Sequence, residues 1–368
     1  MFATHIVVRK EIIIMEHIDT LTTSIRNENL DALLITNPIN RRYISGFTGT
    51  AGVVLITKDS DRIFITDFRY VEQATEQAKG FEIVEHKKAI ENEIQNQIEK
   101  HHIKSLGFEK DDVTYATYET YQKAFKADLI PVSGLVEQLR LIKTTDELEI
   151  MKTAAEIADA AYAHIQSFIK PGVREIDVAH ELEFFMRKQG ATSSSFDMIV
   201  ASGYRSALPH GVASEKEIQT GELVTLDYGA LYKGYCSDTT RTLAVGEISA
   251  ELTDIYETVL EAQKRGVAGI KPGMTGKEAD ALTRNYISDK GYGDYFGHST
   301  GHGLGMEVHE EPRVSPLSDT VLKPGMVVTV EPGIYIPNVG GCRIEDDIVI
   351  TETGNDRLTN ATKELIHL

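Results

Sequence analysis

The sequence predicts a two-domain α/β protein, in which an N-terminal α/β domain precedes a larger α+β domain built from two similar halves. Three observations support this prediction. At 368 residues the chain is long enough to form two separately packed cores. In its N-terminal part, apolar runs typical of strands alternate with stretches that have helical periodicity. Further along, short motifs recur at matching places, which is the signature of an internal repeat.

The first residues are predicted to form an extension that precedes the N-terminal domain. Segment Ile6–Met15 is apolar in places, but it is short and interrupted by charges. It is therefore typical neither of a secretory signal nor of a membrane span. Because Met15 followed by Glu16 is a more natural beginning for a globular domain, we expect a poorly ordered extension over 1–14. The N-terminal domain is expected to span 15–135.

Strands and helices are expected to alternate across the N-terminal domain. Runs rich in β-branched and aromatic residues predict strands, and longer stretches with apolar residues at helical spacing predict helices. The expected strands are Ala32–Thr36, Val53–Thr57, Arg62–Thr66 and Lys104–Phe108, and the expected helices are Phe68–Lys79, Glu91–His101 and Tyr115–Lys126. No cluster of metal ligands or nucleophiles occurs in these segments of the sequence.

A strong helix start marks the beginning of the second domain. Thr144-Thr-Asp-Glu147 matches a capping box, in which the two end residues satisfy each other's backbone N–H groups. An apolar stripe follows at helical spacing. Its members are Met151, Ala154, Ala158, Ala161, Ile165 and Phe168. We therefore expect the domain boundary between Leu135 and Thr144, and a second domain over 144–368.

An internal repeat organises the second domain. Ile169-Lys-Pro-Gly172 recurs as Ile270-Lys-Pro-Gly273, each time between two helical stretches. Later in each half, an apolar run leads from a glycine to a carboxylate six positions on, over Gly221–Asp227 and Gly325–Glu331. The repeat predicts two halves that fold alike and face one another, so that their strand ends meet in one cleft.

Four carboxylates and one histidine of this domain have the chemistry of a two-metal site. A carboxylate at the end of a buried strand is costly unless a cation meets it. About four negative charges gathered together would be offset by two divalent cations. The oxygen-rich set favours Mn²⁺, with Co²⁺, Fe²⁺ or Zn²⁺ as alternatives. The candidate ligands are Asp227, Asp238, His302, Glu331 and Glu345.

Composition restricts the class of protein and its partners. The formal net charge is −18, from 56 acidic and 38 basic residues, so the surface repels phosphate backbones and nucleic acid is not an expected partner. Hydrophobic content of 41% and charged content of 26% are ordinary for a soluble protein. We expect a cytoplasmic protein with no membrane association. Cys236 and Cys342 occupy matching places in the two halves, and in that compartment two reduced thiols are favoured over a disulfide.

Several motifs dispersed over both domains occur in an order that one family shares. They are Asn37-Pro38, Tyr43–Gly49 and Ile65–Tyr70 in the first domain, and Asp227–Asp238, Gly297–Gly303, His309–Pro312, Val330–Gly333 and Arg343–Glu345 in the second. In these motifs the chain resembles the Xaa-Pro peptidases, aminopeptidase P and prolidase, among the pita-bread metallopeptidases. The resemblance implies a creatinase-like N-terminal domain, a pseudo-twofold pita-bread catalytic domain and a homodimer.

The resemblance also implies a role for each candidate ligand. Asp238 and Glu345 would bridge the two cations. Asp227 would complete the shell of one cation, and His302 with Glu331 that of the other. The implied nucleophile is a hydroxide held between the cations, which lower the pKa of water toward neutrality. Glu331 is the implied proton acceptor.

Three further histidines and one arginine are implied to surround the substrate. His298 and His309 would act near the scissile amide, and His210 would lie on the proline side. Arg343 would support the metal carboxylates or contact the substrate. His298 and His302 have the i, i+4 spacing of a helical zinc motif, but the glutamate of that motif is absent and the glycine-rich surroundings predict a loop.

The implied reaction is hydrolysis of the Xaa-Pro bond at the N-terminus of short proline-containing peptides. We expect an Xaa-Pro aminopeptidase acting on peptides longer than two residues, because no residue must serve to recognise the carboxylate of a dipeptide. An Xaa-Pro dipeptidase (prolidase) shares every motif and stays an alternative. Methionine aminopeptidase does not normally carry such an N-terminal domain, and creatinase works without the metal set. A non-catalytic binding module on the same fold would typically have lost ligands.

Overall fold

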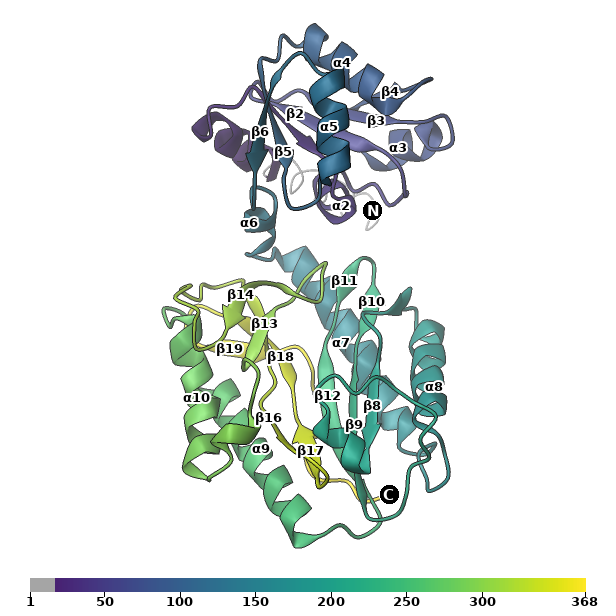
Figure 1. The fold of residues 1–368 in the computed structure, drawn as a ribbon, viewed down its shortest axis with the longest axis vertical. Helices are drawn as coiled ribbons and strands as arrows, with labels where there is room; N and C mark the ends of the chain where they lie inside the picture. Colours follow the sequence, from purple (N-terminus) through teal and green to yellow (C-terminus); the bar gives the residue numbers. More distant parts are fainter. Residues whose placement is uncertain (1–16) are drawn as a thin grey trace, which may run out of the picture. The chain divides into compact units, whose positions relative to one another are not determined.

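The computed structural model describes residues 17–368, which form two compact units with the boundary in the sequence between Arg140 and Leu141 (Figure 1). The extension expected over 1–14 lies outside the described residues. Each unit has hydrophobic core clusters of its own. Within 17–368, no helix is both long and apolar enough to cross a bilayer.

A six-stranded mixed sheet forms the centre of the N-terminal unit, with the strand order β4-β3-β2-β1-β5-β6. Its strands are β1 (Ala32–Ile35), β2 (Val53–Thr57), β3 (Arg62–Thr66), β4 (Glu82–Glu85), β5 (Ser105–Glu109) and β6 (Asp128–Val132). Its helices are α2 (Pro38–Ser45), α3 (Val71–Gln77), α4 (Ile90–Lys100), α5 (Tyr115–Ala124) and α6 (Glu137–Arg140). β1 pairs antiparallel with β2 and parallel with β5, so hairpin and crossover connections are mixed.

Helix α3 is shorter than the expected Phe68–Lys79. The Asp67 side chain accepts the backbone N–H of Arg69 at 3.0 Å, which favours a turn before the helix. Phe68 is 76% exposed, so no apolar contact draws this start into the core. The expected start was therefore wrong by three residues.

Helix α2 was not expected, although its two ends carry recognisable signals. The Asn37 side chain accepts the N–H groups of Ile39 and Asn40, and Pro38 fills the first helical position. Gly46 ends the helix with a left-handed φ of 74°.

The C-terminal unit repeats one order of elements in two halves: a long helix, a shorter helix, and then strands. The first half contains α7 (Thr145–Ile165), α8 (Glu175–Lys188), β7 (Ser193–Ser194), β8 (Ile199–Ser202), η1 (Gly203–Ala207), β9 (Glu222–Tyr228), β10 (Ala230–Tyr232), β11 (Tyr235–Cys236) and β12 (Thr239–Val245). The second contains α9 (Ala250–Gly269), α10 (Gly276–Asp289), η2 (Gly293–Tyr295), β13 (Gly301–Gly303), β14 (Glu310–Val314), β15 (Val327–Val330), β16 (Gly333–Ile336), β17 (Gly340–Arg343), β18 (Asp346–Ile350) and β19 (Asn355–Arg357).

The strands of both halves occupy the middle of this unit, with α8 on one side and α9 and α10 on the other (Figure 1). The first half forms the sheet β12-β9-β8, and the second forms β14-β13-β15-β18-β19. The two sheets adjoin where the backbone N–H of Glu345 donates to the carbonyl of Thr240 at 3.1 Å. The strand ends of the two halves therefore meet at the centre of the unit.

Two local predictions for this unit are confirmed. The capping box at Thr144 and Glu147 is formed in both directions and opens α7. Cys236 and Cys342 are both buried and free, so no disulfide links the halves.

Candidate metal centre

The five candidate ligands all lie at or beside strand ends of the C-terminal unit. Asp227 is the penultimate residue of β9, and Asp238 immediately precedes β12. In the second half, His302 lies within β13, Glu331 directly follows β15, and Glu345 lies between β17 and β18. The fold thus brings residues more than a hundred positions apart to one place, because the two sheets adjoin there.

The ligand atoms lie close enough to share a metal ion. Asp238, His302 and Glu345 each offer one atom, and these atoms are all within 4.8 Å of one another. The Nε2 atom of His302 is 3.4 Å from Glu331 Oε1 and 3.8 Å from Asp238 Oδ2. His302 Nδ1 is 3.0 Å from the carbonyl of Gly303, which favours a proton on Nδ1 and leaves Nε2 as the donor atom for a cation.

Asp227 is held by an arginine and keeps one oxygen unpaired. Arg343 Nη2 donates to Asp227 Oδ2 at 2.6 Å, and Arg343 is only 3% exposed. Asp227 Oδ1 is buried and has no hydrogen-bond partner among residues 17–368. A buried carboxylate oxygen without a partner is costly, and a cation at this position would satisfy it.

Burial makes the cluster unfavourable for negative charge. It raises the pKa of Asp238 and of Glu345 well above the ordinary range, and the neighbouring carboxylates raise both further. Burial also raises the pKa of Glu331 to about 8, and it lowers the pKa of His302. Protons or cations must therefore offset the charge, and a set of hard oxygen donors with one imidazole fits divalent ions such as Mn²⁺.

Neighbouring residues hold Asp238 and Glu345, the two residues that are implied to bridge the cations, through the backbone of both and the side chain of Glu345. Thr240 Oγ1 donates to Glu345 Oε2 at 2.7 Å. The backbone N–H of Asp238 donates to Asp347 Oδ2 at 2.9 Å. Arg241 is 1% exposed and donates both to the carbonyl of Glu345 and to Asp346 Oδ1. These supporting side chains were missed by sequence reasoning, which had no signal for contacts across the two halves.

His298 lies in a segment without helix or strand, so the helical zinc motif was rightly rejected. Burial, helped by the charge of Arg343, lowers the pKa of its imidazole to about 4. Its Nδ1 is 2.8 Å from the carbonyl of Ser299, and its Nε2 is 2.8 Å from the hydroxyl of Tyr335. Arg343 Nη1 donates to that same hydroxyl at 2.7 Å. Tyr335 was missed by sequence reasoning, although it lies only four positions after Glu331.

The other two candidate histidines are exposed. The ring of His309 lies edge-on to that of His302, with 4.4 Å between the ring centroids. His210 lies in the turn that follows η1. The carbonyl of its neighbour Pro209 accepts a hydrogen bond from Arg343 Nη1 at 3.2 Å, which ties this turn to the metal centre.

Family models match both parts of the chain. The model for metallopeptidase family M24 matches 149–352, and the creatinase/prolidase N-terminal domain model matches 17–142. The chain belongs to metallopeptidase family M24. The expected fold class, a creatinase-like N-terminal domain followed by a pita-bread domain, is thereby confirmed.

Solved and curated relatives of this M24 metallopeptidase cover nearly its whole length. A structure described as an Xaa-Pro dipeptidase from Bacillus anthracis is 63% identical, with a TM-score of 0.95, and the match covers 96% of this chain and 100% of that one. A protein named Xaa-Pro dipeptidase from Pyrococcus horikoshii is 45% identical over 360 residues, or 96% and 99% of the two chains. An X-Pro aminopeptidase structure from Thermotoga maritima is 39% identical, with a TM-score of 0.88 and coverage of 92% and 98%.

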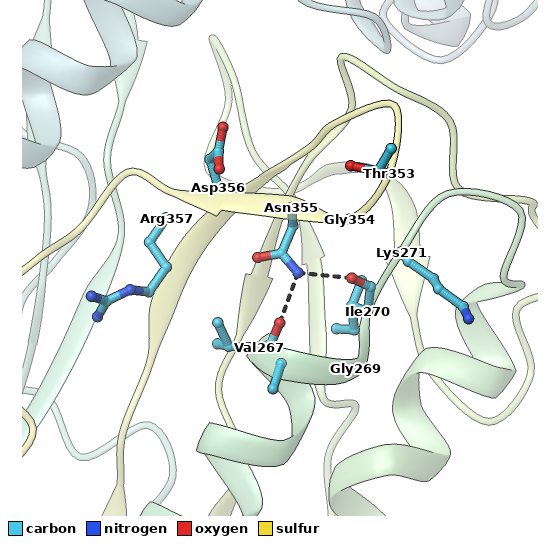
Figure 2. Close-up of a pocket in the computed structure, with 10 residues that line it drawn as sticks. Val267, Gly269, Ile270, Lys271, Thr353, Gly354, Asn355, Asp356 and Arg357 are labelled. Atoms are coloured by element: carbon cyan, nitrogen blue, oxygen red, sulfur yellow. Dashed lines mark hydrogen bonds between the residues drawn. The ribbon is translucent and has the colours of Figure 1, made fainter.

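A separate hollow of about 440 Å³ lies where β19 meets the C-terminal end of α9 (Figure 2). Asn355 Nδ2 donates to the carbonyls of Val267 and Ile270, each at 2.7 Å. Carbonyls at a helix end lack intrahelical partners, so Asn355 caps α9 and joins β19 to it. The side chains of Lys271 and Arg357 point to opposite sides (Figure 2). The hollow is therefore a joint between elements and does not gather reactive groups.

Proposed function

We propose that this M24 metallopeptidase is an Xaa-Pro dipeptidase, with Xaa-Pro aminopeptidase as the second candidate. The observation that carries the proposal is the cluster of Asp238, His302 and Glu345, with Glu331 3.4 Å from His302 and an unpaired oxygen on Asp227. The relatives at 63% and 45% identity bear the dipeptidase name, whereas the X-Pro aminopeptidase is 39% identical. The relatives thus reverse the order expected from the sequence, which placed the aminopeptidase first.

The proposed cofactor is a pair of divalent cations, with Mn²⁺ as the first choice. Asp238 and Glu345 would bridge the pair, Asp227 would serve one cation, and His302 with Glu331 the other. Bound there, the cations would lower the pKa of a water molecule toward neutrality and polarise the substrate carbonyl. Arg343 would hold the carboxylate of Asp227 in a fixed orientation, as its hydrogen bond at 2.6 Å supports.

Two side chains of the site are proposed to handle protons and hydrogen bonds. Glu331 is the proposed proton acceptor, because its carboxylate lies 3.4 Å from His302 Nε2, beside the position proposed for the metal-bound water. His298 has a pKa near 4 and is neutral at neutral pH. The Ser299 carbonyl favours a proton on Nδ1, so Nε2 can accept a hydrogen bond from Tyr335 or from an N–H of the substrate.

Proline specificity is proposed because an Xaa-Pro bond differs in shape from other peptide bonds. The tertiary amide has no N–H, and the ring restricts its backbone. Discrimination by a fitted pocket is worth about 1–3 kcal/mol per apolar contact, or roughly ten- to two-hundred-fold in rate. His210 and His309 are exposed and belong to segments that touch the metal centre, which suits contacts with the proline side of a substrate.

Cleavage assays after Mn²⁺ reconstitution test the proposal. Matched Xaa-Pro, Xaa-Ala and Xaa-Pro-Yaa peptides are compared by release of the N-terminal residue. We expect efficient cleavage of Xaa-Pro, cleavage of Xaa-Ala that is slower by roughly ten- to two-hundred-fold, and little cleavage of Xaa-Pro-Yaa. Preference for Xaa-Pro-Yaa would instead make the protein an aminopeptidase. Equal rates on Xaa-Pro and Xaa-Ala would contradict proline specificity, and no cleavage by the metal-loaded protein would favour the binding module.

The proposal also covers the oligomeric state of the protein and its location in the cell. We propose a cytoplasmic homodimer that acts on short peptides and binds neither nucleic acid nor membranes. Light scattering on the purified protein measures the assembly directly. A mass of one chain would contradict the homodimer.

A further inference from the structure

Helix α10 carries an acid–arginine pair that belongs to no ligand set. Arg284 Nε donates to Asp280 Oδ2 at 2.6 Å, and Arg284 Nη2 donates to Asp280 Oδ1 at 2.8 Å. Asp280 is 1% exposed, and the side chain of Arg284 is 25% exposed. The two-point contact between a planar guanidinium and a carboxylate fixes the orientation of both groups.

This pair also binds the backbone of the segment over 296–300. Arg284 Nη1 donates to the carbonyl of Phe296 at 3.1 Å, and Arg284 Nη2 donates to the carbonyl of His298 at 2.7 Å. Asp280 Oδ1 accepts the N–H of Thr300 at 3.0 Å. Every second residue of the segment is therefore attached to α10 by one side-chain pair.

The segment has no backbone ladder to hold its middle, although Phe296 and Thr300 at its ends are buried. It contains no helix or strand, and Gly297 has no neighbour within 4 Å of the position that a Cβ would occupy. Glycine leaves the backbone at this point conformationally free. The carbonyl of Thr300 accepts the N–H of Glu331 at 2.8 Å, so the end of the segment is also joined to the metal centre.

The arginine fork suits this task better than any other side chain. One guanidinium serves two carbonyls and a carboxylate at once, and its charge centre also lies 4.3 Å from the ring centroid of Phe296. A lysine could keep one of these contacts but cannot form the fork. Loss of the fork would remove the backbone anchors at Phe296 and His298, so the position of the imidazole would depend on its contacts with Ser299 and Tyr335 alone.

We propose that Asp280 and Arg284 are positioning residues, which fix His298 in the orientation needed for turnover. The proposal rests on the proposed function, because it takes His298 to act at the substrate. The pair acts through His298 and not through metal binding or the general stability of the fold.

The first test compares variants of Arg284 with a matched control. In Mn²⁺-loaded protein, Arg284→Met is expected to lower kcat for the best Xaa-Pro peptide by about 10- to 100-fold, because displacement by about 1 Å has effects of this size. KM and the bound metal are expected to stay near the parent values. Arg284→Lys is expected to retain part of the activity. Parent-like kcat in both variants would overturn the proposal.

The control is Arg265→Met. Arg265 forms the same kind of i, i+4 ion pair, with Glu261 on α9 at 2.7 Å, but it bonds to no part of segment 296–300. The Arg265→Met variant is expected to have the kcat, KM and bound metal of the parent. A loss of kcat in this variant equal to that of Arg284→Met would show that any helix–surface arginine matters, which would also overturn the proposal.

A double-mutant cycle separates the positioning role from the proposed function. Arg284→Met is expected to lower kcat in the parent and to add nothing in the His298→Ala background. Fully additive losses would overturn the inference while the role of His298 stands. Parent-like kcat in His298→Ala would instead contradict the role given to His298 in the proposed function.

A readout without substrate completes the test. In protein loaded with diamagnetic Zn²⁺ in place of Mn²⁺, the imidazole ¹⁵N signals of His298, assigned with the His298→Ala variant, are expected to shift and broaden in Arg284→Lys while those of His164 stay unchanged. Thermal melts identify any variant that fails to fold, and Asp280→Asn then replaces it in the same cycle. Unchanged His298 signals in all folded variants would overturn the proposal.

Discussion

The first half of the C-terminal unit contributes two carboxylates to the metal centre, Asp227 and Asp238, whereas the second contributes two carboxylates and the imidazole of His302. Asp227 lies in β9 and Asp238 immediately precedes β12, and these two strands are paired antiparallel over seven residues. The three ligands of the second half come from three places: within β13, directly after β15, and between β17 and β18. The same order of elements therefore supplies two ligands from one pair of strands in the first half, and three ligands from three separate segments in the second half.

The two halves also differ in how they hold the segments that carry histidines. In the first half, the carboxylate of Glu175 is fully buried, and it binds Ser202, Arg205 and Ser214 around η1. That contact fixes η1, but the histidine beyond it, His210, lies exposed. In the second half, the Arg284 pair binds the backbone of His298 itself. The difference fits the roles proposed above, in which His210 binds the substrate and His298 acts in turnover.

The largest expected effect tests whether the halves share one centre. Asp238→Ala or Glu345→Ala is expected to lower kcat by at least about 1000-fold and to reduce bound metal, because each residue is proposed to bridge both cations. Elemental analysis and peptide hydrolysis measure the two effects. Asp356→Ala, which changes an acid outside the centre on β19, is the control. Full activity with parent metal content in either bridging variant would contradict the shared centre.

A smaller effect is expected from replacing the histidines around the centre, and it distinguishes the roles proposed for His298 and His309 from that of His210. His298→Ala and His309→Ala are expected to keep both metals and to lose about 100-fold or more in kcat. His210→Ala is expected to act mainly on KM, since its exposed ring suits binding more than chemistry. Steady-state kinetics with metal analysis separates the cases. Metal loss in His298→Ala would show that His298 and His302 had been assigned the wrong way round.

The smallest effect is a pH dependence of stability in metal-free protein. The pKa of Glu331 is about 8 in the folded chain and near 4.5 when unfolded, so its proton stabilises the fold. That stabilisation is complete below about pH 4.5 and is lost as the pH rises through 8. With a chelator present, Tm is expected to fall by several degrees over this range, and less so in Glu331→Gln. Mn²⁺ is expected to remove most of the slope. A metal-free Tm that rises steadily with pH would contradict the raised pKa.

Local signals in the sequence predicted local structure well. The strands Val53–Thr57 and Arg62–Thr66 have the predicted bounds because both segments are rich in β-branched and other large apolar residues. The start of α7 follows from a capping box that spans only four residues. Helix α3 was predicted too long because the turn at Asp67 and Arg69 competes with helix at its start.

Contacts between distant residues were beyond prediction from one sequence. The repeat indicated which carboxylates to consider, but the pairing of Arg343 with Asp227 joins residues 116 positions apart. The contact of Arg284 with the carbonyl of His298 depends on how α10 packs against a loop. Such contacts follow from tertiary packing, which no local pattern records.

The central claim is that both halves build one site for two cations. Native mass spectrometry of Mn²⁺-reconstituted protein tests it most directly, by counting the ions bound to each chain. The account predicts two ions per chain in the parent and fewer in both Asp238→Ala and Glu345→Ala. Full hydrolysis of Xaa-Pro by protein that carries no ion, or one ion, per chain would contradict it.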